Sequence, residues 1–136
     1  MEIFYKIFIG LILATFIPQT IKTITEIIKT RKLSLSQLFV DGGMPSSHSS
    51  FVSALSTAML LTEKLSMLTL VTIAFSAIVI RDSLGVRLEV EKQKKIFKKL
   101  YPNETLVEQL KREGHTTLQV FAGIIFGAIV MLAVLL

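Results

Sequence analysis

The amino-acid sequence predicts an all-α integral membrane protein: a four-helix transmembrane bundle with a cytoplasmic helical segment between the third and fourth helices. Two observations predict this fold class. Apolar residues make up 51% of the 136 residues, mean hydropathy is +0.65, and the excess gathers in four blocks. The charges gather elsewhere, because 13 of the 15 Lys and Arg fall within residues 18–48 and 81–115. The length suits one domain, residues 1–136.

The first and last apolar blocks are expected to span the membrane. Block 3–17 continues as an amphipathic stretch, which predicts a helix over about 2–30 that Pro18 can bend. Block 118–136 carries no charge and predicts a helix over about 116–136. Each reaches the roughly 20 residues that a spanning helix needs. The acidic start and the absence of a basic leader indicate that the first helix is retained.

The two middle blocks, 51–61 and 65–80, are short and are separated by Thr62-Glu63-Lys64. A charged turn cannot lie at mid-membrane, so a tight hairpin is expected, with helices over about 45–61 and 65–82 whose polar ends are protected by protein. Small residues on both arms suit close helix packing. A re-entrant hairpin that does not cross the bilayer is the alternative.

Four crossings would place residues 18–48 and 81–115 on the same side. The first segment has four basic residues against two acidic, and the second has nine against six. The positive-inside rule then makes this side cytoplasmic and leaves both termini outside, as expected for a multi-pass protein of the cell membrane. Cysteine is absent, which excludes disulfides and thiolate metal sites.

The segment 88–113 is amphipathic and rich in lysine. Tyr101-Pro102-Asn103 should break it into two short helices, the second ending at Gly114. These helices are either solvated or lie against anionic lipid headgroups, where each lysine near the surface contributes about 1 kcal/mol. The lysines concerned are Lys92, Lys94, Lys95, Lys98 and Lys99.

The stretch from Asp41 to Ser50 reads Asp-Gly-Gly-Met-Pro-Ser-Ser-His-Ser-Ser. Pro45 is well placed as the first residue of a helix, which would leave the N–H groups of Ser46, Ser47 and His48 without intrahelical partners. A helix start with such groups is a ready anion site. The alternative is an ordinary capped helix start with a histidine at the membrane interface.

Two further stretches flank the membrane. In the first, Arg87 can hold phosphate oxygens in a fork, and Asp82 could hold Arg87, a histidine or a metal. The positive-inside rule, by which basic residues flank the cytoplasmic end of a membrane helix, is enough to explain Arg81. In the second, His115 precedes the last helix, and Gln119, one turn on, could accept a hydrogen bond from the imidazole and fix its tautomer. An interface histidine without a role is the alternative.

The topology brings these features to one face. His48 and His115 would lie at the starts of helices two and four, and Lys22 and Arg87 at the ends of helices one and three. Two histidines and two cations at one interface indicate phosphoryl transfer, with one histidine attacking phosphorus and the other protonating the leaving oxygen.

These residues also carry a resemblance. Gly-Gly-Met-Pro-Ser-Ser-His-Ser, Asp-x-x-Gly-Val-Arg and Gly-His-Thr resemble a divergent branch of the type 2 phosphatidic acid phosphatase superfamily, small membrane proteins related to acid phosphatases and vanadium-dependent haloperoxidases. The resemblance runs from about Gln19 to Gly127. It implies metal-independent and cofactor-free hydrolysis of a lipid phosphate or diphosphate through a phosphohistidine, by a phosphoric monoester hydrolase. The implied catalytic residues are His115, His48, Asp82 and Gln119, and the implied phosphate-binding residues are Lys22, Ser46, Ser47 and Arg87.

The sequence departs from the superfamily pattern at several points. Gln119 replaces an orienting carboxylate, Ser47 stands where glycine is usual, and Lys-x6-Arg-Pro has no match. Gln109 stands where an arginine is usual. The superfamily core commonly has six helices, so four imply a reduced core or completion by a second copy, as a homo-oligomer.

Two other functions stay open. The chain could be a non-catalytic protein that binds phosphate or lipid, or a small transporter or assembly subunit. It could also be a metal-dependent enzyme that uses Asp41, Asp82, Glu89 and His48 around Mg²⁺. The expected partners are a lipid phosphate and the membrane, with no nucleic acid.

Overall fold

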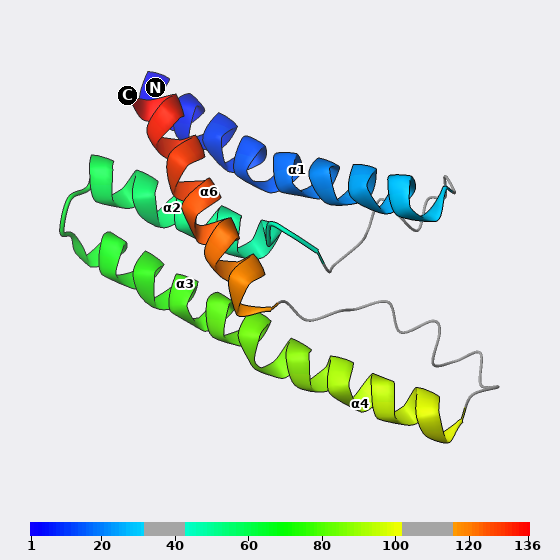
Figure 1. The fold of residues 1–136 in the computed structure, drawn as a ribbon. Helices are drawn as coiled ribbons and strands as arrows, with labels where there is room; N and C mark the ends of the chain where they lie inside the picture. The colour runs from blue at the N-terminus through cyan, green and yellow to red at the C-terminus, as the bar shows by residue number, and fades with distance from the viewer. Residues whose placement is uncertain (32–42, 102–115) are drawn as a thin grey trace.

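A computed structural model describes residues 1–31, 43–101 and 116–136, without the side chains of residues 30, 86–88 and 91. This part of the chain contains five helices and no strand (Figure 1). The helices are α1 (Glu2–Thr30), α2 (Ser47–Thr62), α3 (Met67–Leu84), α4 (Val86–Leu100) and α6 (Thr117–Leu135).

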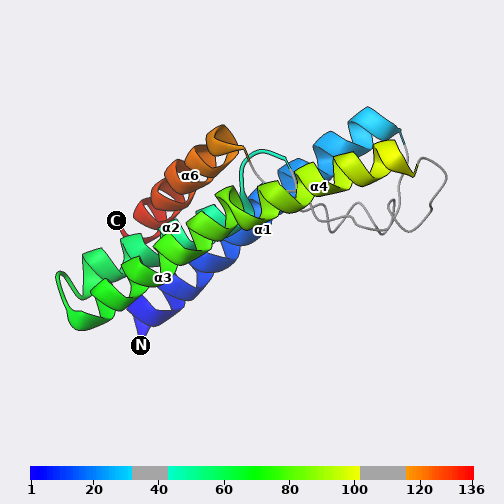
Figure 2. The ribbon, with the colours of Figure 1, turned by 90° about the horizontal axis from the view of Figure 1, so that it is seen from below.

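Helix α2 lies at the centre of the bundle. It packs against α1, α3 and α6, and α1 also packs against α6 (Figures 1 and 2). Helix α4 continues beyond the end of α3 and contacts no other described helix. The N- and C-termini lie toward the same end of the bundle (Figures 1 and 2). The starts of α2 and α6 lie together away from that end, where Ser46 N–H bonds the Gln119 carbonyl.

Two glycines let α6 approach α2 closely. A methyl group at Gly123 would lie 2.5 Å from the carbonyl oxygen of Ser46, and one at Gly127 would overlap the carbonyl of Ser50. The two glycines are four residues apart and so lie on one face of α6, which is the small-xxx-small pattern of membrane helix pairs. Any larger residue at either position would separate the two helices.

Serine hydroxyls join α2 to each of its neighbours. Ser50 Oγ donates to the carbonyl of Ala14 on α1 at 2.6 Å, and Ser53 Oγ donates to the carbonyl of Ile124 on α6 at 2.7 Å. Ser56 and Ser76 share a hydrogen bond of 2.8 Å between α2 and α3. The expectation that small residues on the hairpin arms allow close packing is confirmed.

The inner face of α3 is polar and its outer face is apolar. On α3 the buried residues are Thr69, Thr72, Ser76 and Ser83. The same helix exposes large apolar side chains, namely Leu68, Leu70, Val71, Ile73, Phe75 and Ile78. This arrangement would be unstable in water, where apolar patches of this size are rare, and it suits a lipid environment.

Three helices are long and apolar enough to cross a membrane: residues Glu2–Lys29 of α1, Met67–Leu84 and Thr117–Leu135. The predicted all-helical fold is therefore confirmed for the described residues, which contain three candidate membrane spans where four were predicted. Helix α2 is the exception, because its 16 residues extend only about 24 Å. The predicted hairpin between α2 and α3 is present, with Ser66 capping α3 through its hydrogen bond from Thr69 N–H at 3.2 Å.

The start of α2 differs from the prediction. Pro45 was expected to be the first helical residue, but α2 begins at Ser47. Ser46 has an extended backbone (φ −70°, ψ 118°), and its side chain caps the helix instead. In the predicted cytoplasmic segment 88–113, the first helix is α4, which begins at Val86 and ends at Leu100. The second short helix expected after Asn103 lies outside the described residues.

Candidate functional site

The two segments that carry the predicted motifs meet at one end of the bundle. Ser46, at the start of α2, donates its backbone N–H to the carbonyl oxygen of Gln119, in the first turn of α6, at 3.1 Å. One turn further, Gly123 packs against the Ser46 carbonyl. The Pro-Ser-Ser-His segment is thereby attached to the helix that follows His115.

Ser46 has a structural role in this contact. It is fully buried, and its Oγ accepts hydrogen bonds from Ser49 N–H at 3.4 Å and from Ser49 Oγ at 3.1 Å. The prediction that Ser46 N–H stays available for an anion is wrong, because this group bonds the Gln119 carbonyl. The reason is tertiary: the close approach of α6 supplies an acceptor that local sequence does not show.

The next two residues differ in exposure. Ser47 is 8% exposed, and its Oγ donates to Gln19 Oε1 on α1 at 3.3 Å. His48, one residue on, is exposed to solvent. The helix start therefore presents one hydroxyl held against α1 and one accessible imidazole.

Lys22 is the buried cation of this region. Its side chain is 4% exposed, and it lies against the loop before α2. A methyl group at Gly43 would stand 3.3 Å from Lys22 Cγ and 3.4 Å from Lys22 Cδ. Gly43 has φ +96°, a conformation that glycine adopts without strain. A cation buried this deeply needs polar or anionic neighbours. The role of Lys22 in phosphate binding stays a prediction.

The start of α6 holds a capping box that the sequence analysis missed. Thr116 Oγ1 accepts from Gln119 N–H at 3.4 Å, and Gln119 Oε1 accepts from Thr116 N–H at 3.0 Å. The signal was available, because Thr-x-x-Gln is the spacing of this motif. His115 lies outside the described residues, so its proposed contact with Gln119 stays a prediction.

The junction of α3 and α4 carries the remaining predicted residues. Asp82 is half-buried in the last turn of α3, and the neighbouring Arg81 is exposed. Arg87 lies in the first turn of α4, and its side chain is not described, so the Asp82–Arg87 pair stays a prediction. Among the described residues, no group of three His, Asp or Glu could hold a metal ion. Asp41, from the predicted Mg²⁺ set, lies outside them.

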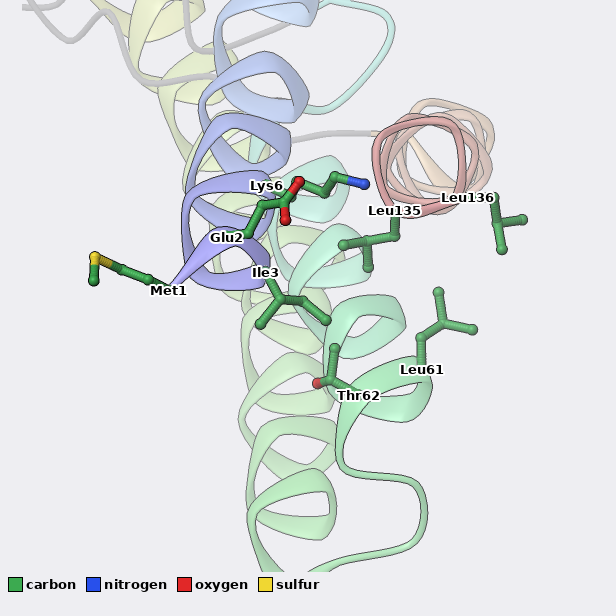
Figure 3. Close-up of a pocket in the computed structure, with 8 residues that line it drawn as sticks. All are labelled: Met1, Glu2, Ile3, Lys6, Leu61, Thr62, Leu135 and Leu136. Atoms are coloured by element: carbon green, nitrogen blue, oxygen red, sulfur yellow. The ribbon is translucent and has the colours of Figure 1, made fainter.

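An open pocket of about 480 Å³ lies at the other end of the bundle (Figure 3). It is formed where α1 begins and where α2 and α6 end, and Glu2 and Lys6 are its charged members. The 16 residues of α2 separate it from Ser46 by about 24 Å. This pocket is therefore not part of the site at the motifs. Its lining residues are Met1, Glu2, Ile3, Lys6, Leu61, Thr62, Leu135 and Leu136.

Comparisons with known proteins bear on the motifs. The family model described as the Divergent PAP2 family matches residues 5–130, a range that includes every predicted site residue. The uncharacterized membrane protein YuiD of Bacillus subtilis (strain 168) is 34% identical over an alignment of 137 positions, which covers 88% of this chain and 87% of that protein. No solved structure matches.

Proposed function

The chain belongs to the Divergent PAP2 family, and on that premise we propose that it is a membrane phosphatase that hydrolyses a lipid phosphate or diphosphate. One observation carries the proposal: the 3.1 Å hydrogen bond from Ser46 N–H to the Gln119 carbonyl. His48 comes two residues after Ser46, and His115 comes immediately before Thr116, which caps α6. The bond thus supports a site in which both histidines act on one phosphoryl group.

In the proposed reaction, an imidazole nitrogen of His115 attacks phosphorus and forms an N–P bond as the P–O bond to the lipid breaks. His48 gives its proton to the leaving oxygen. Water then attacks the phosphohistidine, the N–P bond breaks, and the water proton passes to His48, so that inorganic phosphate leaves and both histidines return to their first state.

The remaining residues would bind the phosphoryl group. Lys22 and Arg87 would stabilise the charge on its equatorial oxygens. The Ser47 hydroxyl would bind the phosphoryl group at the edge of the site. Ser46 would hold the loop before α2 in place through its capping role. Asp82 would position Arg87 or a histidine, and Gln119 would keep the start of α6, and with it His115, in register.

The proposed topology is four crossings, with the site at the cytoplasmic face of the cell membrane and both termini outside. Helix α2 is shorter than the roughly 30 Å hydrocarbon core, but α1, α3 and α6 all pack against it. Its polar ends would therefore meet protein instead of lipid. The basic excess in residues 18–48 and 81–115 supports the cytoplasmic placement.

A second function is favoured by Gln119. Its side chain completes a capping box and has no charge with which to stabilise an imidazolium. A family member with this residue could bind the phosphate of a lipid without hydrolysing it. The two functions share a binding site and differ in turnover.

Phosphate release by the purified full chain in detergent tests the proposal. A panel of lipid phosphates is supplied with a chelator present, and the wild type is compared with His115→Ala, His48→Ala and the control Lys64→Gln, which lies in the α2–α3 turn. Loss of a nucleophile should reduce turnover by about 10³-fold or more, and a labelled phosphoenzyme should be trapped only when His115 is present. Equal turnover by His115→Ala contradicts the mechanism. Phosphate binding without turnover in the wild type would favour the second function.

A further inference from the structure

Helix α4 has a basic side and a largely apolar side. At 100° per residue, its five lysines fall on one side of the helix, and its apolar residues from Val90 onward fall on the other, together with Glu89 and Gln93. The lysines are Lys92, Lys94, Lys95, Lys98 and Lys99. The apolar side is formed by Val90, Ile96, Phe97, Leu100 and the capping residue Tyr101.

No described part of the chain covers the apolar side. Among the described helices, α4 contacts only α3, its neighbour in sequence. Ile96 is 58% exposed and Leu100 is 66% exposed. The rings of Phe97 and Tyr101 stack with their centroids 6.5 Å apart, which extends the apolar surface without burying it. A surface of this kind beside lysines is typical of helices that lie in a membrane interface.

Helix α4 begins where a candidate membrane span ends. Helix α3 is a candidate span of 18 residues, about 27 Å long, and α4 begins at Val86, directly after its end. Gly85 separates the two helices with a non-helical backbone (φ −102°, ψ −84°). In Figure 1 α4 runs on beyond α3, so contact with the bilayer along its length requires a change of direction, for which Gly85 is the natural point.

We propose that α4 binds the anionic lipid surface on the side of the membrane where the candidate site lies. Its lysines contact lipid phosphates, and Ile96, Phe97 and Leu100 enter the boundary between headgroups and acyl chains. The charge favours this occupant over a second copy of the chain, because lipid phosphates complement the excess of lysine on α4, whereas a second copy of α4 carries the same positive charge. Each lysine near an anionic surface strengthens binding by roughly fivefold. The proposal does not depend on catalysis.

The absence of cysteine makes the test direct. A single cysteine is introduced in the full chain, at Ile96→Cys on the apolar side or at Lys95→Cys on the basic side, and is labelled with an environment-sensitive fluorophore. The protein is reconstituted into vesicles of phosphatidylcholine alone or mixed with phosphatidylglycerol. With phosphatidylglycerol, the label at Ile96→Cys should be shielded from a water-soluble quencher, while the label at Lys95→Cys stays accessible. The shielding should be lost in phosphatidylcholine alone and at high salt.

Charge-matched variants serve as controls. In the labelled Ile96→Cys protein, Lys94→Gln together with Lys98→Gln should weaken the shielding. The pair Lys29→Gln and Lys64→Gln removes the same charge outside α4 and should leave the shielding unchanged. Three outcomes would overturn the proposal. The first is that the quencher reaches the label at Ile96→Cys in both lipids. The second is equal shielding of this label in detergent, which would mean that another segment of the chain covers it. The third is shielding that rises with the protein-to-lipid ratio, which would mean that a second copy covers it.

Discussion

The backbone N–H of Ser46 donates to the carbonyl oxygen of Gln119 at 3.1 Å, and this bond joins two motif segments that are far apart in sequence. It is possible because Gly123, one turn along α6, has no side chain to hold the helices apart. The proposed site therefore depends on the packing of α6 against α2 as much as on its reactive groups.

Gly127→Leu should destabilise the bundle. The new side chain would collide with the Ser50 carbonyl on α2, and overpacking of this kind costs about 1–3 kcal/mol. Thermal unfolding in detergent should show a lower midpoint for this variant. Ala133→Leu, an enlargement at an exposed position of the same helix, is the control and should leave the midpoint nearly unchanged. Equal midpoints for both variants would contradict the packing.

The hydrogen bond between Ser56 and Ser76 should appear as an energetic coupling. Single replacements by alanine and the double replacement form a double-mutant cycle. Bonds between membrane helices average about 0.6 kcal/mol in such cycles, with a maximum near 1.7, and we expect a coupling within that range. Thr20→Ala is the control, because the Thr20 hydroxyl bonds only the carbonyl of Phe16 in its own helix. Thr20→Ala should show no energetic coupling to Ser76→Ala. A coupling energy of zero between Ser56→Ala and Ser76→Ala would refute the contact between the two serines.

Gln119→Glu should keep the fold and raise turnover. Glutamate is a favoured residue at this position of a capping box, so its carboxylate can replace the amide that accepts from Thr116 N–H. The added negative charge would stabilise an imidazolium at His115, and an increase of about tenfold corresponds to roughly 1.4 kcal/mol.

The control for this experiment is Gln93→Glu, the same change at an exposed position of α4. It should leave the rate of phosphate release unaltered. If Gln119→Glu unfolds at the wild-type temperature but releases phosphate no faster, the proposed relation between residue 119 and His115 is wrong.

Lys22→Met should weaken phosphate binding. Methionine keeps an unbranched stem against Gly43 and removes the buried charge. Losing one close contact between opposite charges should reduce the affinity for inorganic phosphate by about tenfold to a hundredfold. Because Lys22 has an interaction within the protein that this variant also removes, thermal unfolding is measured as well, and the affinities are compared at a temperature where both proteins are folded. Titration calorimetry measures the affinity, and Lys29→Met, at the exposed end of α1, is the control. Unchanged affinity in Lys22→Met would remove Lys22 from the site.

The helices and their membrane character followed from local features of the sequence. Lipid requires apolar outer surfaces and internally satisfied backbone groups, so hydropathy predicted apolar helices and Glu63-Lys64 predicted the turn between α2 and α3. The capping box at Thr116 and Gln119 was equally local and could have been read from its spacing. The first residue of α2 was misjudged, because Pro45 and the Ser46 cap are competing signals for a helix start.

The relations between helices could not be read in this way. A single sequence shows that Ser46, Ser50 and Ser56 are small and polar, but it does not show which helix each one faces. Their partners Gln119, Ala14 and Ser76 are distant in sequence, and each bond depends on the rotation and close approach of two helices. Local patterns therefore predicted the helices of this protein, while the contacts that bring the proposed site together arise only from the way those helices pack.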